Sequence, residues 1–131
     1  MPHWVSIACV DIGKYKGVCD YEIRSSALIL TDKQKSHIID RRGQEFFDRY
    51  SPFFQEVAEQ PDYIFKDNRH RNTAIACKTL AVDGVNVNLV IRFAVEGDDS
   101  SLENSIITAI LESDKRYRQR IRNNPALYKK S

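Results

Sequence analysis

The sequence predicts an α+β domain in which helices pack on one face of an antiparallel sheet. Predicted strands lie before residue 31 and again between residues 63 and 111, and a run of predicted helices at about 31–59 separates them. An order of strands, helices and strands again is typical of this architecture. The length of 131 residues fits one domain, residues 1–131. A chain of this size buries roughly two thirds of its unfolded surface, which is enough for a core.

The first part of the chain predicts strands and one helix. We expect strands at 5–10 and 27–30, a turn at 13–17 and a weaker strand at 18–23. Thr31 with Gln34 three residues later forms a capping box, which predicts the start of a helix. This helix should run to about Arg42, since Gly43 provides a C-terminal stop.

Aromatic residues at three- and four-residue steps predict a second helical region. They are Phe46, Phe47, Tyr50, Phe53, Phe54 and Val57. Proline suits the first turn of a helix and not its interior, so Pro52 divides the region into two helices at about 44–50 and 52–59. A strand is expected at 63–66.

Residues 73–95 predict a β-hairpin around Asp83-Gly84. A three-residue turn, 82–84, with Gly84 left-handed would place Ile75 opposite Ile91. It would also place Lys78 and Arg92 together on one sheet face. A change of register by one residue would move every side chain of one strand to the other face, so this placement depends on the length of the turn.

The C-terminal part predicts a strand at 105–111 and a helix at 115–123, capped by Ser113 or Asp114 and ended by Pro125. Residues 115–131 contain seven basic residues and no acidic ones, although the whole chain has a net charge of only +2. Such a basic end can bind phosphate backbones. A solvated helix face explains it equally well.

The composition indicates a soluble cytoplasmic protein. No apolar run approaches the ~18 residues of a membrane span, and the N-terminus lacks the pattern of a signal peptide. Cys9, Cys19 and Cys77 are odd in number and scattered, so we expect reduced thiols.

No ligand spacing typical of zinc or magnesium sites is present, and no glycine-rich phosphate loop. We therefore expect no metal and no cofactor. The remaining cationic, hydroxyl and histidine side chains suit cleavage of a phosphodiester without a metal. That reaction needs a proton carrier and fixed positive charge for the transition state.

His37 and Arg41 lie four residues apart on the first helix and share a face, so they could move a proton beside a phosphate. A surface histidine beside a solvated arginine is an equally good interpretation. Arg92 interrupts an apolar strand, where a charge is costly unless it is paired or exposed in a cleft. The alternative is an ordinary arginine on a solvated sheet face. Thr108 is a weaker candidate, because threonine is a common strand residue. Lys78 taken alone is likewise weak. His70, within 68–71, indicates a flexible basic loop tip rather than a proton carrier.

The order of several short segments resembles the phage-associated nucleases with the barnase/EndoU/colicin/RelE-like fold. The matching segments are Ile29-Leu30-Thr31-Asp32, His37-Ile38-Ile39-Asp40-Arg41-Arg42, Pro61-Asp62-Tyr63-Ile64, Asn104-Ser105-Ile106-Ile107-Thr108, Lys115-Arg116-Tyr117, Arg122-Asn123-Asn124 and Leu127-Tyr128-Lys129-Lys130. Together they span about residues 28–130. The family motif commonly has histidine and proline where this chain has Arg42-Gly43.

The resemblance implies an α+β nuclease fold that acts on RNA without a metal. Its active residues would lie on the open sheet face and the first helix. It implies catalytic roles for His37, Arg41 and Thr108, and by position for Lys78 and Arg92. RNA-binding residues would be Arg42, Arg116, Tyr117, Arg118, Arg120 and Arg122.

The leading hypothesis is therefore an endoribonuclease that leaves a 2′,3′-cyclic phosphate, as a toxin or as an effector of a phage or mobile element. In this hypothesis His37 is the acid or base. The partners would be RNA and a cognate inhibitor protein. The alternative is a catalytically decayed module that binds RNA or a protein partner.

Overall fold

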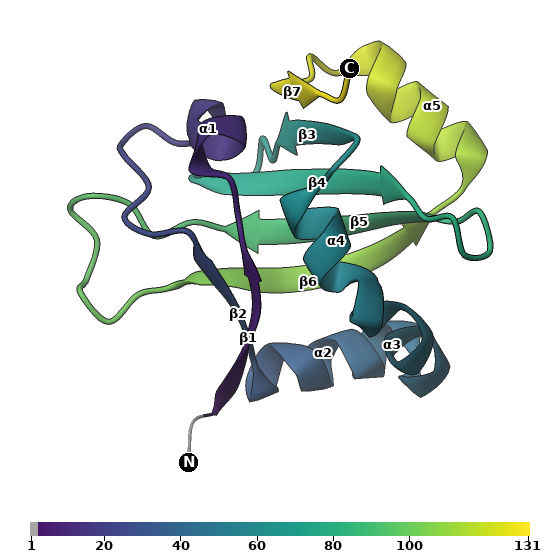
Figure 1. The fold of residues 1–131 in the computed structure, drawn as a ribbon, viewed down its shortest axis with the longest axis horizontal. Coiled ribbons are helices and arrows are strands. Elements are labelled where there is room, and N and C mark those ends of the chain that lie inside the picture. The colour runs from purple at the N-terminus through teal and green to yellow at the C-terminus, as the bar shows by residue number, and fades with distance from the viewer. Residues whose placement is uncertain (1–2) are drawn as a thin grey trace.

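The computed structural model describes residues 3–131 and contains a seven-stranded sheet (Figure 1). The strands are β1 (Trp4–Cys9), β2 (Ala27–Thr31), β3 (Tyr63–Lys66), β4 (Thr73–Thr79), β5 (Asn86–Arg92), β6 (Asn104–Glu112) and β7 (Tyr128–Lys129). Their order across the sheet is β1-β2-β6-β5-β4-β3-β7. All neighbours are antiparallel except β2 and β6, which run parallel over a short stretch. The predicted α+β class is confirmed, with this one parallel pair as an addition.

Within residues 3–131, every α-helix except α1 begins and ends close to the predicted residues. They are α1 (Ile12–Tyr15), α2 (Asp32–Arg42), α3 (Gln44–Tyr50), α4 (Phe54–Glu59) and α5 (Asp114–Asn123), with 3₁₀ turns at Lys16–Val18 and Ser51–Phe53. The Thr31 hydroxyl accepts a hydrogen bond from the Gln34 N–H at 3.1 Å, and Gly43 ends α2 at a φ of 96°. Ser113 caps α5 by accepting from the Arg116 N–H at 3.2 Å. Local capping chemistry was therefore a sufficient guide to these ends.

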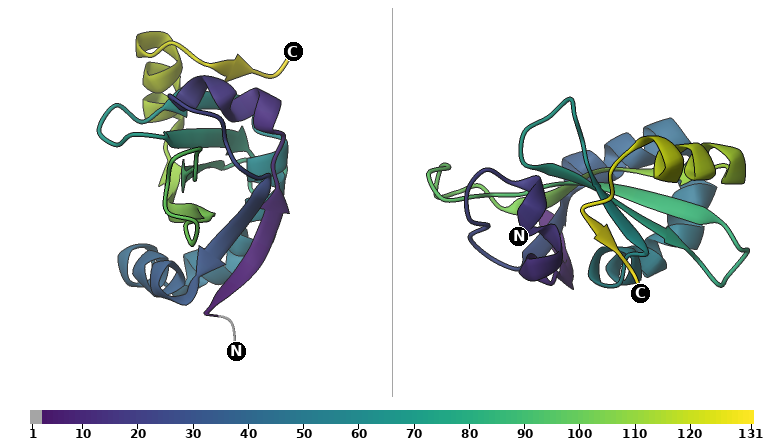
Figure 2. Two further views of the ribbon diagram at one scale, coloured as in Figure 1. Left: turned by 90° about the vertical axis from the view of Figure 1, so that its left-hand side faces the viewer. Right: turned by 90° about the horizontal axis from the view of Figure 1, so that it is seen from above.

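Helices cover both faces of the sheet, and not one face as predicted. The main core lies between the sheet and α2, α3 and α4, where Phe54, Leu89 and Ile106 are fully buried. On the opposite face α5 packs Tyr117 against Phe65 of β3. The left view of Figure 2 shows α5 and α4 on opposite sides of the sheet.

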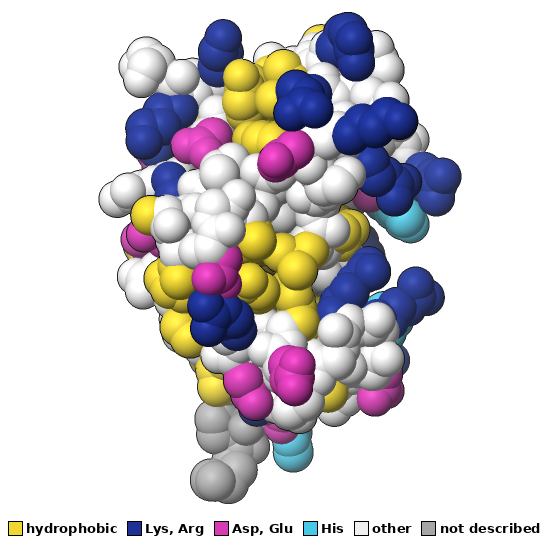
Figure 3. All heavy atoms as spheres, turned by 90° about the vertical axis from the view of Figure 1, so that its right-hand side faces the viewer, with side chains coloured by type: hydrophobic (Ala, Val, Ile, Leu, Met, Phe, Trp, Pro, Cys, Tyr) yellow, Lys and Arg dark blue, Asp and Glu magenta, His cyan; other side chains and the backbone are white. Residues whose placement is uncertain are grey.

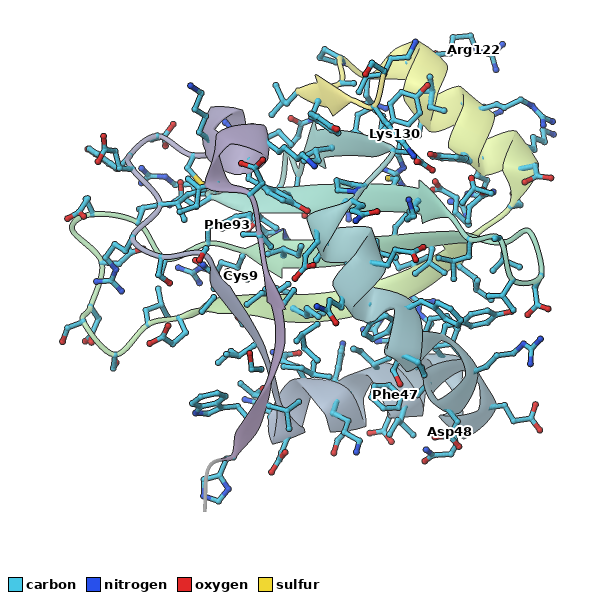
Figure 4. All side chains as sticks on the ribbon, viewed as in Figure 1. Cys9, Phe47, Asp48, Phe93, Arg122 and Lys130 are labelled. Carbon is cyan, nitrogen blue, oxygen red and sulfur yellow. The ribbon has the colours of Figure 1, made fainter. Side chains whose placement is uncertain are left out.

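Residues 3–30 close one end of the main core. Tyr15 of α1 is fully buried, and its ring centre lies 5.1 Å from that of Phe93 with the two rings tilted by 47°. Phe93, labelled in Figure 4, follows β5. Residues 13–17 were expected to form a turn but belong to α1 and the following 3₁₀ turn, since the Asp11 side chain caps α1 by accepting from Gly13 N. Residues 18–23 form no regular strand; Ile23 makes an isolated bridge to Val95.

The β4–β5 hairpin has a register one residue away from the predicted one. Ile75 pairs with Val90, and not with Ile91, and the Leu80 N–H donates to Val85 O across a four-residue turn. Gly84 is left-handed as expected, with a φ of 61°, but Asp83 is left-handed as well, with a φ of 60°. The two consecutive left-handed residues close a longer turn.

Contacts from α3 hold Asp83 in this uncommon conformation. The Arg49 guanidinium donates to Asp83, with Nη2 2.6 Å from Oδ1, and the Tyr50 hydroxyl donates to Oδ2 at 2.8 Å. Hydrogen bonds from Arg49 and Tyr50 lower the pKa of Asp83 to about 2. The turn, and with it the hairpin register, therefore depends on a contact with α3.

None of the helices in the described part of the chain is both long and apolar enough to cross a membrane.

Candidate functional site

A pocket of about 500 Å³ opens on the sheet face opposite the main core, which we call the open face. Strands β4, β5 and β6 form its floor, and the loop between β3 and β4 forms its wall. The lining residues are Asp67, Arg69, His70, Arg71, Thr73, Val90, Arg92, Ile107 and Thr108. The structure thus brings together Arg92 and Thr108, two of the residues singled out in the sequence.

A β-bulge in β6 turns Thr108 into this pocket. Ile91 pairs with Ile106, but the next residue back, Val90, pairs with Thr108, so Ile107 is an extra residue in β6. In a strand without the bulge, the alternation that starts from the core-facing Ile106 would point Thr108 into the main core. Bulges often redirect side chains beside functional sites. Here the bulge places a hydroxyl next to the side chains of β5.

The wall of the pocket is an ordered turn. Asp67 Oδ1 accepts from the Arg69 N–H at 2.8 Å, and Asp67 Oδ2 lies 3.2 Å from His70 Nδ1. At the end of the loop the Thr73 hydroxyl donates to Arg71 O at 2.8 Å. His70 was interpreted as a flexible loop tip, but its ring is oriented by a carboxylate. The signal in the sequence was the Asp-x-x-His spacing directly after a strand.

The hydrogen bond to Asp67 determines which nitrogen of His70 is available. When Nδ1 carries the proton and donates to Asp67, the Nε2 lone pair is free to accept a proton. The imidazole side chain is 71% exposed, so a bound molecule can reach it. Asp67 is largely buried, with a side chain 16% exposed.

The pocket has a strong excess of positive charge. Arg69, Arg71 and Arg92 line it together with His70, against a single carboxylate, that of Asp67. Arg71 also pairs with Asp20 at 3.1 Å, in an exposed position, whereas Arg69 and Arg92 make no ion pair within residues 3–131. Unpaired guanidinium groups beside a hollow are suited to bind phosphate or carboxylate groups.

Basic side chains are not spread evenly over the molecule. Figure 3 shows Lys, Arg and His side chains gathered along the right-hand edge, on both sides of a hollow. That edge corresponds to the back of the molecule as drawn in Figure 1, the side on which α5 lies.

Lys78 does not belong to the pocket. It pairs with Val87 and points toward the main core, whereas Arg92 pairs with Thr73 on the open face. Its Nζ donates to Gln60 O at 2.8 Å. The expectation that Lys78 and Arg92 share a face is wrong, because the hairpin register differs by one residue.

His37 and Arg41 are exposed on α2 and do not line the pocket. At about 100° per residue they project from the side of α2 opposite to Lys35, whose Nζ lies 5.4 Å from the centre of the Phe47 ring. That contact faces α3, so His37 and Arg41 face away from α3. His37 makes no hydrogen bond to a carboxylate in the described part of the chain that would orient its ring.

Arg42 has a structural contact at the edge of the sheet. Its Nε donates to Ala109 O of β6 at 3.1 Å. Strand β2 pairs with β6 only at Asn104 and Ser105, so Arg42 contacts a part of β6 that β2 does not cover. Arg42 therefore fixes α2 beside β6, one residue from Thr108.

On α5, two of the expected RNA-binding residues are structural. Tyr117 is 8% exposed and packs on Phe65 and Cys77, so its ring is not available for base stacking. Arg120 forms a two-pronged ion pair with Glu112, with Nη2 2.7 Å from Oε2. Both assignments are corrected, because α5 uses this side to cover the sheet.

The Glu112 carboxylate is held in its ionised form. Burial alone would raise its pKa, but hydrogen bonds from Arg120 and Asn88 outweigh burial and lower the pKa below its ordinary value. The expected RNA-binding residues Arg116, Arg118 and Arg122 are exposed, and Arg122 projects from the end of α5 (Figure 4).

No group of three or more His, Cys, Asp or Glu side chains within residues 3–131 is arranged to hold a metal ion. Comparisons with family models, with curated proteins and with solved structures found no match for this chain.

Proposed function

We propose that the protein is a metal-independent endoribonuclease whose active site is the pocket on the open face. The observation that carries this proposal is the combination of one carboxylate-oriented imidazole, His70, with the guanidinium groups of Arg69, Arg71 and Arg92 and the hydroxyl of Thr108 in one pocket. Imidazole is the side chain best suited to move protons near neutral pH. Fixed cations stabilise the charge that develops on a phosphate.

His70 would act as the general base. Its Nε2 takes the proton of an RNA 2′-hydroxyl, and the 2′-oxygen forms a bond to phosphorus. The P–O5′ bond then breaks, and water supplies a proton to the departing 5′-oxygen. The products are a 2′,3′-cyclic phosphate and a free 5′-hydroxyl.

Asp67 would support this step by keeping the His70 proton on Nδ1 and stabilising the imidazolium that forms, as carboxylates paired with histidine do in other enzymes. Arg92 would hold the phosphate from β5. Arg69 and Arg71, on the loop, would approach it from the other side of the pocket.

Thr108 would donate its hydroxyl hydrogen to a phosphate oxygen. Its Oγ1 is buried and makes no hydrogen bond among residues 3–131. A buried polar atom without a partner carries a free-energy cost, which a bound phosphate oxygen would remove.

His37 and Arg41, assigned as catalytic in the sequence hypothesis, would serve outside the pocket as additional contacts to the RNA backbone. The exposed arginines of α5 would do the same. The nucleic acid would then pass across the open face between α2 and the β3–β4 loop.

The test is incubation of the purified protein with a 5′-labelled single-stranded RNA in buffer containing EDTA. We expect cleavage at an unchanged rate with EDTA and a terminal 2′,3′-cyclic phosphate by mass spectrometry. RNA with 2′-deoxy nucleotides at the cleavage site should stay intact. Binding without cleavage would contradict the enzymatic role and favour an RNA-binding module. Cleavage of the deoxy substrate would contradict the mechanism.

A further inference from the structure

A second hollow of about 500 Å³ lies beside the open-face pocket, and both are lined by Arg71 and Arg92. The segment before β2 contributes Tyr21 to its wall, and the loop after β5 contributes Glu96 and Asp98. The two hollows thus meet at two guanidinium groups.

Tyr21 has an exposed ring on an anchored backbone. The residue as a whole is 61% exposed. On one side the Asp20 N–H donates to Asn72 Oδ1 at 3.3 Å, and on the other the Glu96 N–H donates to Glu22 O at 2.9 Å. The ring is therefore held at a defined place in the wall of the second hollow.

The opposite wall of the second hollow is anchored as well. Arg24 donates to the backbone oxygens of Asp98 at 2.9 Å, Asp99 at 2.8 Å and Leu102 at 2.8 Å. One guanidinium group thereby holds the loop between β5 and β6 in shape.

We infer that the two hollows bind adjacent nucleotides of a single-stranded RNA, with the connecting phosphate at Arg71 and Arg92 and one base stacked on Tyr21. The assignment rests on the proposed function in one respect, namely that the open face binds RNA.

The distribution of charge supports this division. Arg71 and Arg92 stand where the hollows meet, which is the place for a phosphate. Glu96 and Asp98 line the second hollow beyond them and would repel a phosphate, so an uncharged base fits there.

The geometry selects a single strand. In a duplex, neighbouring bases stay stacked about 3.4 Å apart along the strand. Bases that enter separate hollows must separate and expose their faces, which single strands do readily. Val90 and Ile107 offer apolar surface to the base in the first pocket.

The experiment measures binding of a fluorescein-labelled 2′-O-methyl RNA hexamer, which lacks the attacking hydroxyl, by fluorescence anisotropy. Stacking of a base on an aromatic ring contributes about 1–3 kcal/mol, or roughly 5- to 150-fold in affinity. We expect Tyr21→Ala to weaken binding by a factor in this range and Tyr21→Phe to bind like the wild type. Trp4→Ala, which removes an aromatic ring 45% exposed on β1, is the matched control and should have no effect.

The same hexamer annealed to its complement should bind much more weakly than the single strand, and Tyr21→Ala should not change that binding. Equal binding of duplex and single strand, or full affinity in Tyr21→Ala, would overturn the inference. The cleavage assay is independent of this readout. Tyr21-dependent binding with no cleavage would contradict only the proposed nuclease, and cleavage with no effect of Tyr21→Ala on binding would contradict only the two-hollow model.

Discussion

Thr108 combines two properties that structural residues rarely share. Its hydroxyl is buried and has no hydrogen-bond partner in the described chain, and a β-bulge places the residue in the lining of a pocket that also contains arginines. A hydroxyl kept for stability would be expected to bond within the protein. An experiment can therefore test whether the Thr108 hydroxyl serves the stability of the fold or the reaction in the pocket.

We expect Thr108→Val to leave the free energy of unfolding unchanged or to raise it by up to about 1 kcal/mol, because valine has the same shape without the unpaired hydroxyl. The cleavage rate should fall roughly 100-fold if the hydroxyl contacts the transition state. Urea denaturation and a cleavage assay on the same preparation measure both quantities. A loss of stability with full activity would show that Thr108 is only structural.

Lys78 and Arg92 form a second comparison, since they lie on opposite faces of the sheet. The Lys78 side chain is 10% exposed, bonds to Gln60 O and lies 3.7 Å from Asp62 Oδ1. Lys78→Met should therefore cost about 1–3 kcal/mol of stability. It should leave the cleavage rate of the folded protein nearly unchanged.

Arg92→Met should show the reverse. The side chain is exposed, so the free energy of unfolding should change by less than about 0.5 kcal/mol. The cleavage rate should fall roughly 100-fold through loss of a phosphate contact. If Lys78→Met slowed cleavage at full stability, the separation of the two faces would have no functional meaning.

At the scale of the element, α5 has one side for the sheet and another for solvent. Tyr117 and Arg120 cover β3, β4 and β6, whereas Arg116, Arg118 and Arg122 are exposed. These two sides should respond differently to neutralisation of charge.

We expect the triple change Arg116→Gln, Arg118→Gln and Arg122→Gln to flatten the salt dependence of RNA binding. Each phosphate contact to a single strand contributes about −0.7 to the slope of log K against log salt. Loss of three contacts should therefore make this slope less negative by up to about 2. Arg120→Gln is the control and should leave the slope unchanged, since Glu112 already neutralises Arg120. Binding titrations at several salt concentrations measure both, and an unchanged slope in the triple variant would show that α5 does not touch RNA.

The Glu112–Arg120 pair also predicts a dependence of stability on pH. The pKa of Glu112 is lower in the folded protein than in the unfolded chain, where it is about 4.3. The folded state therefore binds fewer protons, and its stabilisation is present above that value and is lost as the pH falls through the folded pKa. Measured by urea denaturation, the difference in the free energy of unfolding between the wild type and Glu112→Gln should become smaller from pH 6 to pH 3. A constant difference would contradict the ionised pair.

At the scale of the whole molecule, the sequence predicted what local chemistry determines. The caps at Thr31 and Ser113 and the stop at Gly43 depend on neighbours within four residues, and all three are confirmed. The hairpin register was missed because Asp83 takes its conformation from Arg49 and Tyr50, more than 30 residues earlier in the chain.

The candidate site was predicted in part for the same reason. Arg92 stood out as a charge in an apolar strand, and it does lie on the open face with Thr108. The pairing of His70 with Asp67, by contrast, gains meaning only when the sheet brings their loop beside β5 and β6. The packing of α5 on the second face was likewise invisible, because its Tyr117 contacts strands about 40 and 50 residues away in sequence.

The most direct test of the active-site assignment compares the two histidines in the cleavage assay with EDTA. His70→Asn should reduce the cleavage rate roughly 100- to 10,000-fold, the usual contribution of a positioned acid or base. His37→Asn is the matched change on α2 and should retain most of the rate, with both variants as stable as the wild type because both side chains are exposed. Loss of cleavage in His37→Asn with full activity in His70→Asn would contradict the assignment and place the reaction on α2.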